Sequence, residues 1–98
     1  MKHKLASVQY KVPVTFFKEN DIFVAYSAVL DLSTSGKTFE QAQSRFEEAA
    51  EIFFEETIEH GTLDEVLSNL GWTKVRQQWM PPVEVAHSSQ LVSIPQIA

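Results

Sequence analysis

The chain has 98 residues, no cysteine and a formal net charge of −5. This length fits one ordinary domain, and the absence of cysteine excludes disulfides and cysteine nucleophiles, as is typical of proteins in a reducing cytoplasm. The negative charge argues against non-specific nucleic-acid binding, which requires Lys and Arg to displace counterions from phosphates. The sequence also shows no secretory signal and no run near the ~18 apolar residues of a transmembrane helix, so we expect one soluble cytoplasmic domain.

Alternating apolar and polar residues predict a half-buried strand from Ser7 to Phe17. Pro13 lies inside this segment and cannot donate a ladder hydrogen bond, so we expect either a bulge there or an unpaired side of the strand. Residues 18–21 are polar and rich in turn formers, which predicts a turn. The apolar segment 22–32 then predicts a second strand that forms a hairpin with the first.

Both faces of the second predicted strand contain apolar side chains. One face contains Ile22, Val24, Tyr26, Ala28, Leu30 and Leu32, and the other contains Phe23, Ala25, Ser27 and Val29. We expect the face with Phe23 to be covered as well, by a late segment of the chain, by a second copy in a homo-oligomer, or by a partner protein. Phe23 and Val29 are therefore candidate partner-binding residues.

A long helix is predicted from Thr38 to His60, after a polar, glycine-containing turn with a brief third strand around residues 33–37. A capping box opens the helix: the Thr38 hydroxyl accepts from a backbone amide and the Gln41 side chain reaches back. Gly61 ends it, because a left-handed residue is least costly there. The stripe facing the sheet comprises Phe39, Ala42, Phe46, Ala49, Ala50, Phe53 and Thr57.

The C-terminal part of the chain, residues 62–98, gives weaker signals. A second capping box at Thr62 predicts a short helix over residues 62–71. Residues 72–98 are expected to form an arm and a late strand, within which residues 72–80 fit either a strand or an arm. Two short apolar segments, Val83–Ala86 and Leu91–Ile94, fit a hairpin or a single strand that rejoins the sheet.

Side chains that support catalysis or metal binding are sparse. The three histidines, His3, His60 and His87, are far apart and lack the spacing of helical metal ligands. Asp31 is the one carboxylate inside a strand pattern, where it fits a strand end or a turn cap; paired with a helix glutamate, it would alternatively support acid–base chemistry or Mg²⁺ binding. We therefore predict no catalytic residue, no metal site, no cofactor and no enzymatic activity.

The strongest remaining feature is an acidic row on the long predicted helix. Its members are Glu47, Glu51, Glu55 and Glu59. Like charges four residues apart cost a few tenths of a kcal/mol per pair in an isolated helix. Burial of each phenylalanine on the opposite stripe contributes about 1.5–3 kcal/mol, which is enough to offset that cost, so the row is explained as a solvated face. Alternatively, the row attracts a basic partner and raises the rate of encounter.

The order of these features resembles the HicB family of antitoxins. The resemblance rests on Ile22-Phe23-Val24-Ala25-Tyr26-Ser27, the segment 30–38 with its polar turn and capping threonine, and the helix start Phe39-Glu40-Gln41-Ala42. It covers about residues 8–60. The chain departs from the family in two ways: residues 62–98 offer no ribbon-helix-helix or helix-turn-helix segment, and Leu32-Ser33-Thr34 stands where the family tends to have Pro-Gly-Cys.

The resemblance implies a partial RNase-H-like fold without that fold's catalytic carboxylates. The expected fold class is α+β in the order β-β-β-α-α-β: a three-stranded antiparallel meander packed by one long helix, then a short helix, then a C-terminal strand that rejoins the sheet. One HicB-like domain spans residues 1–98, with its core at about residues 7–60. HicB proteins bind small basic HicA toxins, which cleave mRNA, and block their RNA-binding surface and active site.

We therefore expect a stand-alone HicB-like antitoxin or protein-binding module. It would form a homo-oligomer, bind no operator DNA directly, have no membrane partner, and neutralise a small basic HicA-type toxin. The expected partner-binding residues are Glu47, Glu51, Glu55, Glu59, Phe23 and Val29. The alternative function is a small RNase-H-like enzyme or nucleic-acid-binding domain that uses Asp31.

Overall fold

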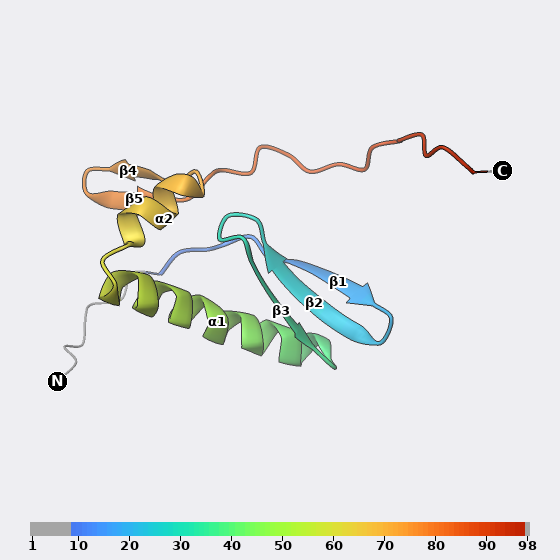
Figure 1. The fold of residues 1–98 in the computed structure, drawn as a ribbon, viewed down its shortest axis with the longest axis horizontal. Helices are drawn as coiled ribbons and strands as arrows, with labels where there is room; N and C mark the ends of the chain where they lie inside the picture. The colour runs from blue at the N-terminus through green and yellow to red at the C-terminus, as the bar shows by residue number, and fades with distance from the viewer. Residues whose placement is uncertain (1–8, 98) are drawn as a thin grey trace.

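The computed structural model describes residues 9–97 and has the expected α+β architecture. Three antiparallel strands, β1 (Thr15–Glu19), β2 (Ile22–Ser27) and β3 (Leu32–Gly36), form a meander in the order β1-β2-β3. The long helix α1 (Phe39–Glu59) packs on one face of this sheet, and the short helix α2 (Leu63–Asn69) follows it (Figure 1). The three-stranded meander, the long helix and the short helix confirm the predictions from the sequence.

The first strand is displaced from its predicted position. β1 begins at Thr15, after Pro13, and continues through Lys18 and Glu19, which were expected in the turn. Pro13 has no N–H, and the ladder begins after it. Both expected alternatives at Pro13, a bulge or an unpaired side, were wrong because Pro13 lies outside the strand. Residues 7 and 8 lie outside the described part of the chain. The hairpin closes over two residues, and Asn20 adopts a φ of 56° that this tight turn requires.

The sequence pattern implied that the long helix would cover the face of β2 that carries Val24 and Tyr26. In the structure, α1 covers the other face, which carries Ala25 and Ser27. Ala25 and Ser27 are both fully buried, whereas Ile22 is 47% exposed on the open face. α1 is able to approach this face closely because small residues meet there. Ala42 of α1 is also fully buried. A Cβ atom added at Gly36 would lie only 2.7 Å from the backbone nitrogen of Ala42, so a larger residue does not fit at position 36. The face with Phe23 is therefore covered, and it is covered by α1.

The start of α1 has the predicted capping geometry. The Thr38 hydroxyl accepts a hydrogen bond from the Gln41 amide at 3.0 Å, and the Gln41 side chain accepts one from the Lys37 amide at 2.7 Å. After the helix, Gly61 adopts a φ of +68°, the left-handed conformation that favours glycine. At the start of α2 the Thr62 side chain makes no capping hydrogen bond, so the second capping box was predicted wrongly.

The predicted C-terminal strand that rejoins the sheet does not form, because residues 83–86 and 91–94 have no regular secondary structure. β4 (Thr73–Val75) and β5 (Gln78–Met80) pair with each other in a separate two-stranded sheet, which corrects the predicted topology. Trp72, just before β4, is 4% exposed, and its indole N–H donates a hydrogen bond of 2.7 Å to the Val29 carbonyl in the turn after β2. Trp72 therefore connects the segment after α2 to the sheet, through its buried ring and this hydrogen bond.

A single apolar core joins the sheet, α1 and α2. Its buried members are Ala25, Leu30, Ala42, Phe46, Leu67 and Trp72. Beyond Met80, residues 81–97 have no regular secondary structure and extend away from the core as an arm (Figure 1). The arm helps to make the molecule elongated, with extents of 62 × 31 × 22 Å.

Candidate protein-binding surface

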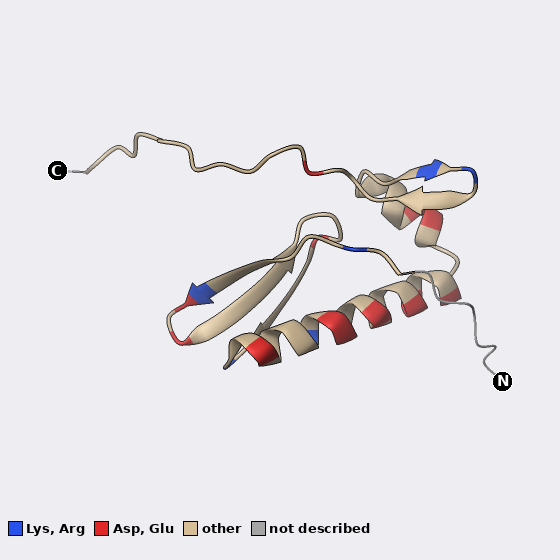
Figure 2. Cartoon of the chain, turned by 180° about the vertical axis from the view of Figure 1, so that it is seen from behind, with Lys and Arg blue, Asp and Glu red and all other residues tan. Residues whose placement is uncertain are grey.

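The predicted acidic row lies along α1 as a continuous exposed line. Glu47, Glu51, Glu55 and Glu59 are all exposed, and none of them forms an ion pair with a residue in the described range 9–97. At 1.5 Å rise per residue, the row is about 18 Å long. Figure 2 shows the acidic positions distributed along the helix. Their negative charges are thus available to a partner.

An apolar row lies beside the acidic one on the same helix. Phe46, Ala50, Phe54 and Ile58 also follow one another at four-residue spacing, and both rows line one large open groove with a volume of about 1790 Å³. The sequence stripe included Phe46 and Ala50 but missed Phe54 and Ile58. Extending the four-residue spacing from Phe46 would have identified both. The glutamates therefore border an apolar floor.

The far wall of the groove comes from segments distant in the sequence. Tyr10, Val12 and Val14 approach from before β1, and Leu63, Leu67, Trp72 and Trp79 come from α2 and the β4–β5 hairpin. Tyr10 and Phe54 both meet the Trp72 ring edge to face, with centroid separations of 6.3 and 6.4 Å. Aromatic side chains that are large, partly exposed and held in place are typical of protein-binding surfaces.

The charges that line the groove are mainly negative. Beside the four glutamates it contains Lys11 and no other Lys or Arg among its described lining residues. The basic side chains near α1 and β4 interact elsewhere: Arg45 donates to the Ser35 carbonyl at 2.9 Å, and Lys74 lies 3.7 Å from Asp64. An apolar groove with a negative rim complements an amphipathic, positively charged surface.

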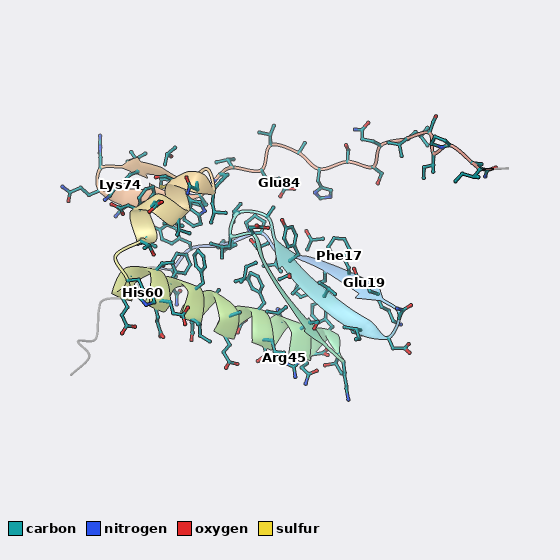
Figure 3. All side chains as sticks on the ribbon, viewed as in Figure 1. Phe17, Glu19, Arg45, His60, Lys74 and Glu84 are labelled. Carbon is teal, nitrogen blue, oxygen red and sulfur yellow. The ribbon has the colours of Figure 1, made fainter. Side chains whose placement is uncertain are left out.

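His60, His87 and Asp31 are placed apart from one another, and His3 lies outside the described residues. His60 caps the exposed end of α1 (Figure 3), and His87 lies on the arm 3.3 Å from Glu84. Asp31 is an exposed turn residue with a φ of 47°, which matches its interpretation as a turn residue. Over residues 9–97, no three His, Asp or Glu side chains cluster as metal ligands would.

Among residues 9–97, Asp31 has one side-chain hydrogen-bond partner, Tyr26 on β2. The Tyr26 hydroxyl donates to a carboxylate oxygen of Asp31 at 3.3 Å. Desolvation of the partly buried ring, and then the negative charge and hydrogen bond of Asp31, raise the pKa of Tyr26 above its ordinary value. This contact gives the Asp31 carboxylate a structural role beside the turn between β2 and β3.

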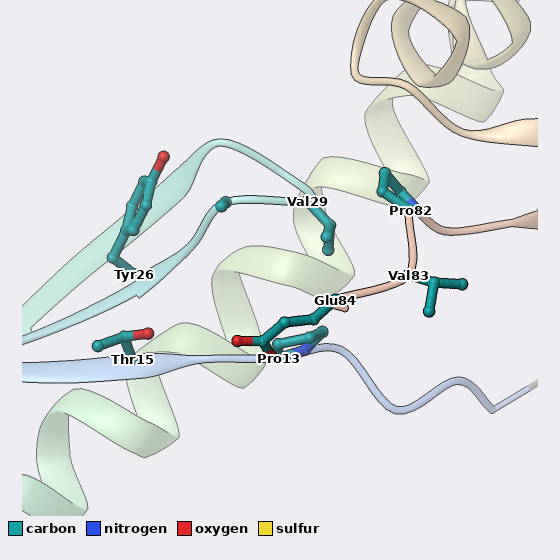
Figure 4. A pocket seen from close by; sticks show the side chains of 8 residues that line it. Pro13, Thr15, Tyr26, Val29, Pro82, Val83 and Glu84 are labelled. Atoms are coloured by element: carbon teal, nitrogen blue, oxygen red, sulfur yellow. The ribbon is translucent and has the colours of Figure 1, made fainter. Parts of the chain in front are cut away.

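The other two predicted binding residues are not near the acidic row. Phe23 lies on the α1 side of the sheet, partly buried against the core, with the Lys18 ammonium 5.7 Å from its ring centroid. Val29 is partly buried beside Trp72 and lines a second, smaller pocket of about 310 Å³ with Pro13, Tyr26 and Pro82 (Figure 4). The structure thus unites the four glutamates and separates Phe23 and Val29 from them.

Comparison with family models, curated proteins and solved structures found no match to this chain. Within residues 9–97, neither α1 nor α2 combines the length and the apolar character needed to cross a membrane. The surface must therefore be interpreted from its own geometry and charge.

Proposed function

We propose that this chain is a protein-binding module that captures a small basic protein along α1. The observation that supports this most directly is the adjacency of the two rows, because the exposed glutamates border an apolar groove rather than an entirely solvated face. In its more specific form, the proposal is a HicB-like antitoxin that neutralises a HicA-type mRNA-cleaving toxin in the cytoplasm. The order of elements from β2 to α1 supports that form through the family resemblance.

The two rows have different roles in such a complex. Apolar side chains of the partner that enter the groove bury Phe54, Ile58 and Trp79, and this burial supplies most of the affinity. The glutamates attract the basic partner over longer distances, increase the association rate and disfavour acidic competitors. The net charge of −5 has the same sign as this local field.

Neutralisation follows from competition for the same basic surface. A protein that cleaves RNA must bind phosphates through Lys and Arg. A line of carboxylates about 18 Å long occupies such residues and excludes phosphate from them, without any chemistry by the antitoxin itself. The proposal therefore needs no catalytic residue, cofactor or DNA-binding segment in this chain.

The test is co-expression with small basic proteins encoded beside this gene. An adjacent protein that arrests growth should be neutralised by the intact chain, and the triple variant Glu47→Lys, Glu51→Lys, Glu55→Lys should lose that rescue. A matched control replaces Glu40, Glu48 and Glu56, which are exposed on α1 outside the groove, with the same change in net charge. Equal loss in both variants would mean that overall charge matters and the groove does not.

Failure of rescue with every adjacent basic protein would remove the antitoxin form of the proposal. The broader protein-binding form would then be tested by affinity capture from the source cells, comparing the intact chain with the triple groove variant. Capture of one basic protein by the intact chain alone supports the broader form. Equal capture by both chains, or none, contradicts it.

A further inference from the structure

The C-terminal arm, residues 81–97, exposes apolar side chains that a folded chain usually buries. Val83, Val85, Leu91, Val92, Ile94 and Ile97 are between 75% and 103% exposed. Figure 3 shows arm side chains directed into solvent along its length. Glu84 is the only Asp, Glu, Lys or Arg in the arm, so charge does not compensate for the exposed apolar surface. Such a segment needs a partner surface.

The exit of the arm from the core is fixed in direction. Pro81 and Pro82 are partly buried, and the Pro82 ring lies 3.5 Å from where a Cβ atom of Gly71 would stand. Pro82, Val83 and Glu84 then pass beside Pro13 and Thr15 at the start of β1 (Figure 4). Two consecutive prolines restrict the backbone to extended conformations. The chain passes the start of β1 without pairing with it and continues outward (Figure 1).

The strand β1 offers an unoccupied edge to such a segment. Among the described residues, β1 pairs with β2 alone, and its other side carries unpaired backbone groups. Phe17 of β1 is 49% exposed on the open face of the sheet, next to the equally exposed Ile22 of β2. The opposite edge, β3, is less available because Arg45 donates to its Ser35 carbonyl.

We propose that two copies of this chain form a dimer by exchanging arms, with Leu91–Ile94 of each arm added as a strand to the β1 edge of the other copy. In a strand, Val92 and Ile94 lie on one face and continue the apolar surface of Phe17. Pro95 ends the added strand, since it cannot donate to a ladder.

The area that the two added strands bury reaches the lower end of what a stable dimer requires. A Val, Leu or Ile side chain removes about 60–120 Å² of apolar surface from water on full burial. The three apolar side chains of Leu91–Ile94 on each of two arms, with the surfaces that they cover, give on the order of 700–1,400 Å² in total. This reaches the lower end of the about 1,200–2,000 Å² of a standard interface. The nearly uncharged arm also avoids repulsion between two copies that each carry a charge of −5.

This proposal does not depend on the proposed function, because no residue of Leu91–Ile94 lines the groove along α1. Its test uses the absence of cysteine, which makes any introduced cysteine unique. Full-length Lys18→Cys and full-length Ser93→Cys proteins are mixed, one carrying a mass tag, and treated with a short bis-maleimide crosslinker. We expect a crosslinked pair that contains one tagged and one untagged chain. A mixture of Glu56→Cys and Ser93→Cys is the control and should give little product, since Glu56 lies on α1.

Sedimentation provides the second measurement. The intact chain should sediment with twice its mass of 11.1 kDa, and the Val92→Asp, Ile94→Asp variant should sediment as a monomer with an unchanged far-ultraviolet circular dichroism spectrum. The Ser89→Asp, Gln90→Asp variant adds the same charge to the arm outside the added strand and should remain a dimer. A monomeric intact chain overturns the proposal. So does a Lys18→Cys, Ser93→Cys double variant that crosslinks only within one chain while the mixed single variants fail.

Discussion

The core of this molecule and its C-terminal arm contain the same kinds of apolar residues in opposite environments. Leu30 and Leu67 are buried in the core, whereas Leu91 on the arm is fully exposed. The difference arises because the sheet, α1 and α2 provide surfaces for one another, and the arm has none within the described chain. The contribution of an apolar residue to the stability of the fold therefore depends on the contacts that it makes. It cannot be assigned from the residue type alone. Substitutions at residues in different environments test that statement.

The largest contrast is between Trp72 and an apolar residue of the arm. Trp72→Ala removes a buried ring and its hydrogen bond to Val29, so we expect the free energy of unfolding to fall by about 3–5 kcal/mol. Ile97→Ala, at a fully exposed position outside the proposed added strand, should change it by less than about 0.5 kcal/mol. Urea denaturation followed by circular dichroism measures both. Similar losses for the two variants would contradict the assignment of Trp72 to the core.

The second contrast is between the two threonines that precede helices. Thr38→Ala should lower the free energy of unfolding by about 1 kcal/mol, because it removes the hydrogen bond to the Gln41 amide. Thr62→Ala should cost less than about 0.5 kcal/mol, because the Thr62 side chain makes no capping bond. Thr38→Ser, which keeps the hydroxyl, serves as the control and should recover most of the loss. Equal effects at both sites would show that α2 is capped after all.

The smallest effect concerns the ionisation of Tyr26. Its pKa is raised in the folded state by desolvation and then by Asp31, so the neutral phenol is favoured by folding. The resulting stabilisation is present below the ordinary tyrosine pKa of about 10 and is lost as the pH rises through the folded value. Asp31→Asn should move the pKa of Tyr26 downward in an ultraviolet titration on a Tyr10→Phe background. No movement would mean that Asp31 does not affect the ring.

The sequence predicted the helices well and the sheet incompletely. The period of α1, the Thr38 cap and Gly61 are local signals, since each depends on residues within one or two turns. The buried face of β2 was harder to predict, because the side chains on both faces of this strand are apolar. Only the packing of α1 against the sheet decides which face is buried. The small Ala25, Gly36 and Ala42 explain that choice, but their meeting depends on a contact between distant segments.

The candidate surface was also predictable from the sequence only in part. The acidic row was visible in the sequence because four glutamates on one helix share a side at four-residue spacing. The far wall of the groove was not visible, because it needs Tyr10 from before β1 and Trp72 and Trp79 from beyond α2. Phe23 and Val29 were proposed as binding residues because the second face of the predicted strand is apolar, and the fold places both away from the glutamates.

By itself, the sequence determined the helices, the acidic row and the number of strands in the meander, because hydrophobic period and capping are encoded within short segments. Only the tertiary structure decided which face of β2 is buried, where Trp72 docks, and that the C-terminal strands form their own hairpin. These outcomes depend on which apolar surfaces meet. Burial is non-directional and selects the partner surface that packs best, which a local pattern does not specify.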